Sequence, residues 1–230
     1  MIFIDFYDDS NAVHTLDTNS VLTNTFFRMF LGLLASALTA FFAYSSGMYE
    51  TMIYNGYYAI LAIIEVVVVL VFSFLFKKLS PTAVTVLFFA YAFLNGFTLS
   101  VVFAAYELTS IAYAFIATSA LFGALAYLGY KTDKDISNLG TILTVALLIG
   151  IVLTIINIFL RSSALDIFLD WAILFIFFGL TVYDINKIKQ MQSMGFCDDE
   201  KLYVYGAMQL YLDFINIFLR ILSLFGKRRN

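Results

Sequence analysis

The sequence is poor in charged residues, in cysteine and in proline. Only 13% of its 230 residues are charged, against about 25% in a typical soluble domain. The formal net charge of −3 provides no basic face, which excludes nucleic acid as a partner. The single cysteine, Cys197, excludes an intrachain disulfide and a cysteine metal cluster. The single proline, Pro81, and the lack of a Gly- or Ser-rich linker favour one undivided domain.

Apolar residues make up most of the sequence. They make up 62% of the chain, and the mean hydropathy is +0.92. A globule of this size has too little interior for them, so many must face lipid. Runs long enough to cross about 30 Å of hydrocarbon as helices occur at residues 25–44, 52–76, 82–105, 110–130, 139–160, 164–185 and 202–225. The prediction is an all-α, polytopic membrane protein with seven transmembrane helices.

The two ends of the chain are polar. Residues 1–24 contain four aspartates and no lysine or arginine, the reverse of a signal peptide. We therefore expect an acidic soluble tail at 1–24, a seven-helix transmembrane domain at 25–226 and a short basic tail at 227–230. The lipid bilayer is the first partner that this composition implies.

The loop charges predict an orientation. The side that holds the N-terminus carries seven lysines, at positions 77, 78, 131, 134, 187, 189 and 201. The opposite side carries four basic residues, at positions 161, 227, 228 and 229. Because positive charge gathers on the cytoplasmic side, we expect a cytoplasmic N-terminus. If the protein is bacterial, its place is the cytoplasmic (inner) membrane.

The last apolar run carries a polar stripe. It consists of Gly206, Gln209, Asp213, Asn216 and Arg220, at successive spacings of 3, 4, 3 and 4. These spacings place the stripe on one helix face. We expect it to meet other protein or a water-filled path, because lipid would leave its polar groups unsatisfied. Gln209 and Asn216 are therefore candidates for an ion path.

Asp184, near the end of the preceding run, is a candidate partner for Asp213. The two runs are joined by a short connection and should be antiparallel neighbours, so we infer that the carboxyls come within reach. Two carboxyls in a low-dielectric site cannot both ionise cheaply, so they should share a proton and titrate as a unit. Loss of that proton would push the helices apart. Ionised, Asp184 and Asp213 could also bind a cation such as Ca²⁺.

Each of these candidates also has a purely structural interpretation. A buried aspartate pair can hydrogen-bond and fix helix packing without any switch. Glu65, the acidic residue of the second run, is equally compatible with a buried hydrogen bond and with an ion path.

Blocks spread along the chain resemble the Bax inhibitor membrane family, in its bacterial branch. The resemblance covers about residues 20–226 and is carried by Phe26-Phe27-Arg28, Ser80-Pro81-Thr82, 95–100 (NGFTLS), 129–135 (GYKTDKD), Val182-Tyr183-Asp184 and 210–216 (LYLDFIN). It implies a seven-helix fold with the seventh span at the centre. It also implies a pH-sensitive Ca²⁺ leak, with calcium as the transported ion and no bound cofactor.

The resemblance also assigns roles to residues. It implies that Asp184 and Asp213 form the pH sensor and gate, and that Glu65 matches the acidic residue of the second span. The family has a basic latch residue near the end of the second span, for which this chain offers only Lys77 or Lys78.

Two functions of other classes compete with a channel. The protein could be a non-transporting regulator that binds a membrane protease, or another membrane partner, through its acidic N-terminal tail. An intramembrane aspartyl protease is disfavoured, because Asp213 follows Tyr-Leu rather than Gly-x-Gly, and the single proline, Pro81, lies elsewhere and not in a Pro-Ala-Leu motif. We therefore expect no enzymatic activity.

Overall fold

The computed structural model describes residues 18–229, and every regular element within them is a helix. The helices are α1 (Thr18–Ser45), α2 (Met48–Tyr54), α3 (Tyr57–Leu75), α4 (Pro81–Ala105), α5 (Leu108–Lys131), α6 (Ser137–Leu160), α7 (Ser163–Ser193) and α8 (Asp199–Phe225). All except the short α2 are long and apolar enough to cross a membrane, which gives seven candidate spans. The predicted all-α, seven-span architecture is confirmed.

Local sequence sets several helix ends. Ser80 caps α4 by accepting a hydrogen bond from the Ala83 amide at 3.2 Å, and Pro81 occupies the first helical position. Gly56 adopts a left-handed φ of 70°, which glycine tolerates better than other residues. It separates α2 from α3, so the predicted start of the second span at residue 52 is wrong. That span begins at Tyr57.

Two helices extend beyond the apolar runs that predicted them. Helix α1 begins at Thr18 rather than residue 25, and α7 continues to Ser193 rather than ending at 185. The added turns are held by protein contacts: Val21 and Leu22 are buried in α1, and Ile188 is buried in α7. Hydropathy detects lipid-facing turns, whereas these turns pack on other helices. The acidic residues 1–17 lie outside the described residues.

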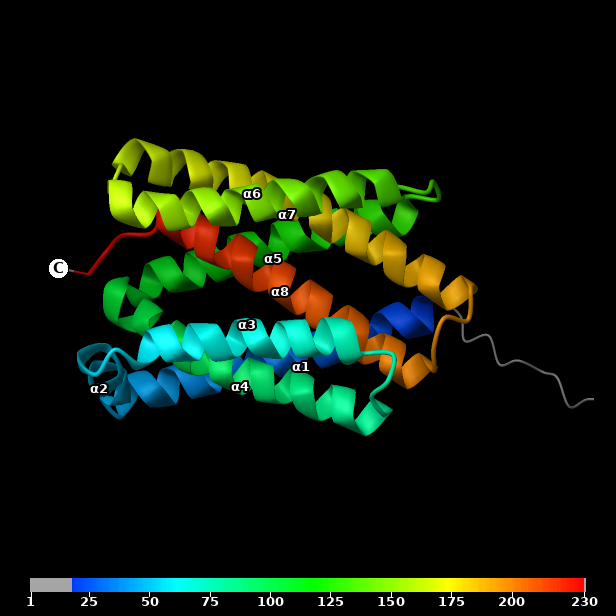
Figure 1. Cartoon of the computed structure of the whole chain (residues 1–230), viewed down its shortest axis with the longest axis horizontal. Helices are drawn as coiled ribbons and strands as arrows, with labels where there is room; N and C mark the ends of the chain where they lie inside the picture. The colour runs from blue at the N-terminus through cyan, green and yellow to red at the C-terminus, as the bar shows by residue number, and fades with distance from the viewer. Residues whose placement is uncertain (1–17, 230) are drawn as a thin grey trace, which may run out of the picture.

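Helix α8 runs obliquely between two groups of helices (Figure 1). It packs against α1, α4, α5 and α7. It is also the most buried span, since 56% of its most apolar window is buried, against 6% for α3 and 11% for α6. Helix α3 packs on α4 and α6 packs on α7, both at the outside. A seventh span surrounded by all six others is therefore not confirmed.

The C-terminal residues are attached to the bundle. The Glu107 amide donates to the Lys227 carbonyl at 3.0 Å, and the Arg229 amide donates to the Ala105 carbonyl at 2.9 Å. Lys227 and Glu107 also form an ion pair of 2.7 Å. This end lies opposite the turns that join α3 to α4, α5 to α6 and α7 to α8 (Figure 1). The lysine-rich turns thus share the end of the bundle where α1 begins.

Candidate functional site

The polar stripe of α8 faces α7 along much of its length. A Cβ atom at Gly206 would lie 2.8 Å from the Ile188 side chain, so the helices approach closely there. Further along, Asp213 interacts electrostatically with Asp184, and Arg220 pairs with Asp170. From residue 206 to residue 220 a helix rises about 21 Å. The contacts of Gly206, Asp213 and Arg220 thus define a polar seam between α7 and α8, whereas Gln209 and Asn216 of the same stripe are only half buried.

Asp184 and Asp213 lie in the middle of this seam. Only 6% of Asp184 and 3% of Asp213 is exposed. The Asp213 Oδ2 atom is buried and has no hydrogen-bond partner within residues 18–229. Thr181, beside it, donates its hydroxyl to the Phe177 carbonyl at 2.8 Å. Thr181 also lies within hydrogen-bonding reach of the Asp213 carboxyl, so Oδ2 is the oxygen left without a partner. A carboxylate with an unpartnered oxygen is costly to ionise in a low-dielectric interior, so the arrangement favours a proton on the pair. The role of the pair as a sensor stays a prediction.

Lys187 is a basic residue close to the aspartate pair. It lies one turn after Asp184 on α7 and interacts electrostatically with it. Its Nζ is 5.5 Å from the ring centroids of both Tyr183 and Tyr205. Lys187 therefore places a positive charge at the lysine-rich end of the seam.

The two predicted latch residues lie elsewhere. Lys77 and Lys78 are exposed in the turn after α3, and neither takes part in an ion pair of residues 18–229. The Lys77 Nζ lies 4.6 Å from the centre of the Phe196 ring. A latch role for either residue remains untested.

Glu65 belongs to a separate polar network. Its Oε1 accepts a hydrogen bond from Thr98 Oγ1 at 2.6 Å, and its Oε2 accepts one from Asn95 Nδ2 at 3.4 Å. The Tyr211 hydroxyl donates to Asn95 Oδ1 at 2.8 Å and lies 2.7 Å from Ser36 Oγ. This network joins α3, α4, α8 and α1. Tyr211 and Asp213 are two residues apart and point to different faces of α8, so the structure does not bring Glu65 to the aspartate pair.

Comparison with known proteins identifies the family to which the chain belongs. The family model described as "Inhibitor of apoptosis-promoting Bax1" matches residues 18–230. The chain belongs to the Bax inhibitor family. The inner membrane protein YbhL of Escherichia coli K12 is 42% identical over 212 residues, covering 87% of this chain and 88% of YbhL.

Other bacterial members of the Bax inhibitor family are similar along most of their length. An uncharacterized protein of Borreliella burgdorferi is 34% identical over 217 residues, covering 92% of this chain and 94% of that protein. An uncharacterized membrane protein of Streptococcus pyogenes serotype M3 is 37% identical over 179 residues, covering 77% of this chain and 76% of that protein. Together with the seven apolar helices, these relatives confirm the predicted class, a multi-pass protein of the inner membrane.

The far end of the seam in this Bax inhibitor family protein contains a residue that sequence analysis missed. Asp170 is 9% exposed, and its Oδ1 lies 2.5 Å from Arg220 Nη1. Its Oδ2 accepts a hydrogen bond from Ser223 Oγ at 2.6 Å. The sequence does contain a signal for this ion pair, because Asp170 lies inside a predicted apolar run, where a charged residue usually indicates a buried partner.

The remaining ion-path candidates are only half buried. Asn216 donates to the Leu212 carbonyl of its own helix at 2.8 Å. Gln209 makes no hydrogen bond within the described residues. Their place in an ion path is untested.

Within residues 18–229 no group of three or more acidic, histidine or cysteine side chains could hold a metal. Ca²⁺ takes 6–8 oxygen ligands, so at Asp184 and Asp213 water or backbone oxygens would supply the rest.

Proposed function

We propose that this protein is a Ca²⁺ leak pathway that opens as the pH rises, with Asp184 and Asp213 as its proton-sensitive switch. The observation that carries the proposal is a pair of buried, interacting carboxyls on adjacent helices, one of which has an unpartnered oxygen. Intramembrane carboxyls are expensive and commonly mark ion or proton pathways. The resemblance to the Bax inhibitor family supports the same assignment. No catalytic role and no bound cofactor is part of the proposal.

The direction of the pH dependence follows from the charge on the pair. With a shared proton, Asp184 and Asp213 together carry one negative charge and hold α7 against α8. Without it they carry two, in a site where Asp213 Oδ2 has no hydrogen bond to offset the charge. The repulsion favours separation of the helices. Ca²⁺ entry should therefore be low at acidic pH and rise as the pair loses its proton.

Both ends of the seam are closed in this structure, and opening would have to move them. On the lysine-rich side the Tyr205 ring lies 6.5 Å from the Phe72 ring and 5.0 Å from the Phe76 ring, centre to centre. On the other side the ion pair between Arg220 and Asp170 joins α8 to α7, and opening would have to separate it. Once the seam is open, two ionised carboxylates would offer Ca²⁺ oxygen ligands at its midpoint.

Ca²⁺ entry into liposomes that contain the purified protein and an internal calcium indicator tests the proposal. Wild-type flux should rise with pH, and Asp213→Asn should flatten the profile because asparagine cannot lose a proton in this range. Asp133→Asn is the matched control, since Asp133 is exposed at the lysine-rich end, outside the seam. An unchanged profile in Asp213→Asn contradicts the switch.

Absence of flux at every pH would instead favour the alternative, a regulator that binds a membrane protease or another membrane partner. Deleting residues 1–17, the part of the predicted tail that precedes α1, separates these two functions. The deletion should leave flux intact if the protein is a leak pathway, and it should abolish regulation if the tail binds the partner.

A further inference from the structure

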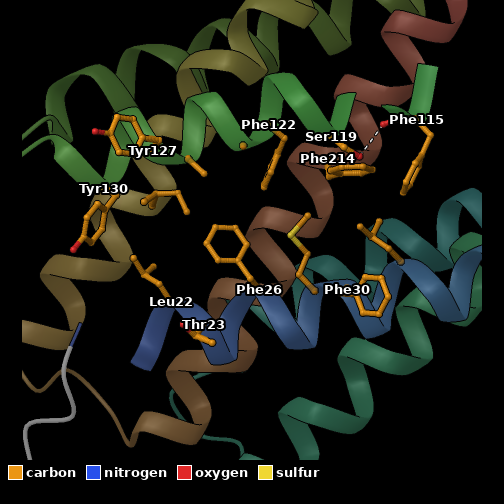
Figure 2. Close-up of a pocket in the computed structure, with 15 residues that line it drawn as sticks. Leu22, Thr23, Phe26, Phe30, Phe115, Ser119, Phe122, Tyr127, Tyr130 and Phe214 are labelled. Atoms are coloured by element: carbon orange, nitrogen blue, oxygen red, sulfur yellow. Dashed lines mark hydrogen bonds between the residues drawn. The ribbon is translucent and has the colours of Figure 1, made fainter. Parts of the chain in front are cut away.

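A groove opens between α1 and α5 in the lipid-facing wall of the bundle (Figure 2). Both helices pack on α8, but within residues 18–229 they make no close backbone contact with each other. The space between them has a volume of about 760 Å³. Phe26 and Phe122 meet edge to face across its floor, with ring centres 6.4 Å apart. The groove is therefore a depression with a packed floor and an open side.

The lining of the groove is apolar along most of its length. Phe30 and Phe115 lie at one end, and Phe214 of α8 contributes to the floor (Figure 2). Gly123 leaves the wall open, because a Cβ atom added there would meet no heavy atom within 4 Å. Concave apolar sites of about 300–1,000 Å³ accept small apolar ligands. In a bilayer the apolar group present at high concentration is the lipid acyl chain.

The opposite end of the groove is aromatic and basic. Tyr127 and Tyr130 line it near the start of α1, at the lysine-rich end of the bundle (Figure 2). The Lys131 Nζ lies 5.8 Å from the Tyr127 ring centre, and the Lys189 Nζ lies 5.3 Å from the Tyr130 ring centre. Tyrosine and lysine at this depth are typical of the headgroup region, and basic pockets between helices bind anionic headgroups.

Of the two lysines beside the tyrosines of the groove, one has an ion pair and the other has none. Lys189 pairs with Asp133 at 3.3 Å and donates to the Tyr130 carbonyl at 2.5 Å. Lys131 is exposed, and none of the ion pairs of residues 18–229 includes it. The charge available to a ligand at the mouth of the groove is therefore that of Lys131.

We propose that this groove binds an anionic phospholipid of the surrounding bilayer, with an acyl chain along the floor and the phosphate at Lys131. The charge at one end and the apolar channel leading from it match the two parts of such a lipid. The floor includes Ile185 and Phe214, the chain neighbours of Asp184 and Asp213. The bound chain would thus pack against the two helices that carry the aspartate pair. The proposal does not depend on Ca²⁺ transport.

Photo-crosslinking tests the identity of the occupant. The probe is p-benzoylphenylalanine in place of Ser119, an exposed residue on the wall of the groove. The protein is placed in nanodiscs of equal phosphatidylglycerol and phosphatidylcholine, illuminated and analysed by mass spectrometry. We expect lipid adducts in which phosphatidylglycerol exceeds phosphatidylcholine. Equal amounts of the two lipids, or crosslinks to a second copy or to residues 1–17, would overturn the proposal.

Two pairs of variants assign the adduct to the groove. Lys131→Glu should lower the ratio of phosphatidylglycerol to phosphatidylcholine by about fivefold or more, since one basic residue near the surface contributes about that factor. Lys78→Glu, an exposed lysine at the same end of the bundle, should leave the ratio unchanged. Gly123→Leu should fill the groove and reduce all lipid adducts severalfold, whereas Ala124→Leu on the same helix should not. Undiminished adducts in Gly123→Leu, or an unaltered ratio in Lys131→Glu, contradict the assigned site.

Discussion

The Arg220 guanidinium on α8 lies 2.5 Å from the Asp170 carboxylate on α7, and this ion pair closes one end of the polar seam. The exposed fraction is 28% for the Arg220 side chain and 12% for the Asp170 side chain, so the pair is partly shielded from solvent and lipid. Ser223 Oγ donates to the second carboxylate oxygen at 2.6 Å. Three side chains thus fasten the two helices that carry Asp184 and Asp213.

Removing one partner of this ion pair should destabilise the protein more than removing both. Arg220→Leu leaves the Asp170 carboxylate without its counter-charge, which costs about 3 kcal/mol in shielded pairs. The double variant Arg220→Leu with Asp170→Leu should recover most of that loss. Thermal unfolding in detergent measures both. Equal melting temperatures for the single and double variants would show that the pair contributes little.

Tyr211→Phe should weaken the network around Glu65 without altering the pH response. The variant removes the hydroxyl that joins Asn95 to Ser36 and leaves the Asn95 Oδ1 acceptor unsatisfied. The expected loss of stability is about 1–3 kcal/mol. Because this network lies on another face of α8 from Asp213, the shape of the flux profile against pH should not change. A displaced profile would connect Glu65 to the aspartate pair.

Two glycines should respond to alanine in opposite directions. A Cβ atom at Gly206 would lie 2.7 Å from Thr25 Cγ2 and 2.8 Å from Ile188 Cδ1. Gly206→Ala should therefore force α8 away from α1 and α7, at a cost of about 1–3 kcal/mol. Gly123→Ala meets open space and should gain about 0.5–1 kcal/mol from its better helix propensity. Melting temperatures of the two variants check the contrast, and a stable Gly206→Ala protein would contradict the close approach.

Lys187 should set the pH at which the pair loses its proton. Lys187 lies one turn after Asp184 on α7, and a positive charge that close to a carboxyl group favours its ionised form. Lys187→Met should therefore move the rise in Ca²⁺ flux to higher pH. Lys77→Met is the matched control and also tests the predicted latch. A shift in Lys77→Met and none in Lys187→Met would restore the latch role to the turn after α3.

The sequence carried enough information to predict the spans and the polar seam. Length and hydropathy suffice for spans such as α6, which faces lipid almost all round, and periodicity suffices for the stripe through Asp213. Both signals are local. By the same reasoning, an aspartate inside an apolar run such as Asp170 could have been paired with Arg220.

Other features depend on tertiary packing and leave a weaker local signal. The first turns of α1 and the last turns of α7 bury side chains such as Val21 and Ile188 in the protein, so hydropathy truncates them. The outer positions of α3 and α6 follow from which helices pack together, which composition does not specify. The groove beside Gly123 exists because α1 and α5 each pack on α8 and not on each other.

A double-mutant cycle of Ca²⁺ flux against pH tests the central claim most directly. The claim is that Asp184 and Asp213 share one proton and act as a single switch. If so, Asp184→Asn, Asp213→Asn and the double variant should each abolish the rise of flux with pH in liposomes, and the double variant should add nothing to either single one. A wild-type rise that persists in the double variant, or effects of the single variants that simply add, would contradict it.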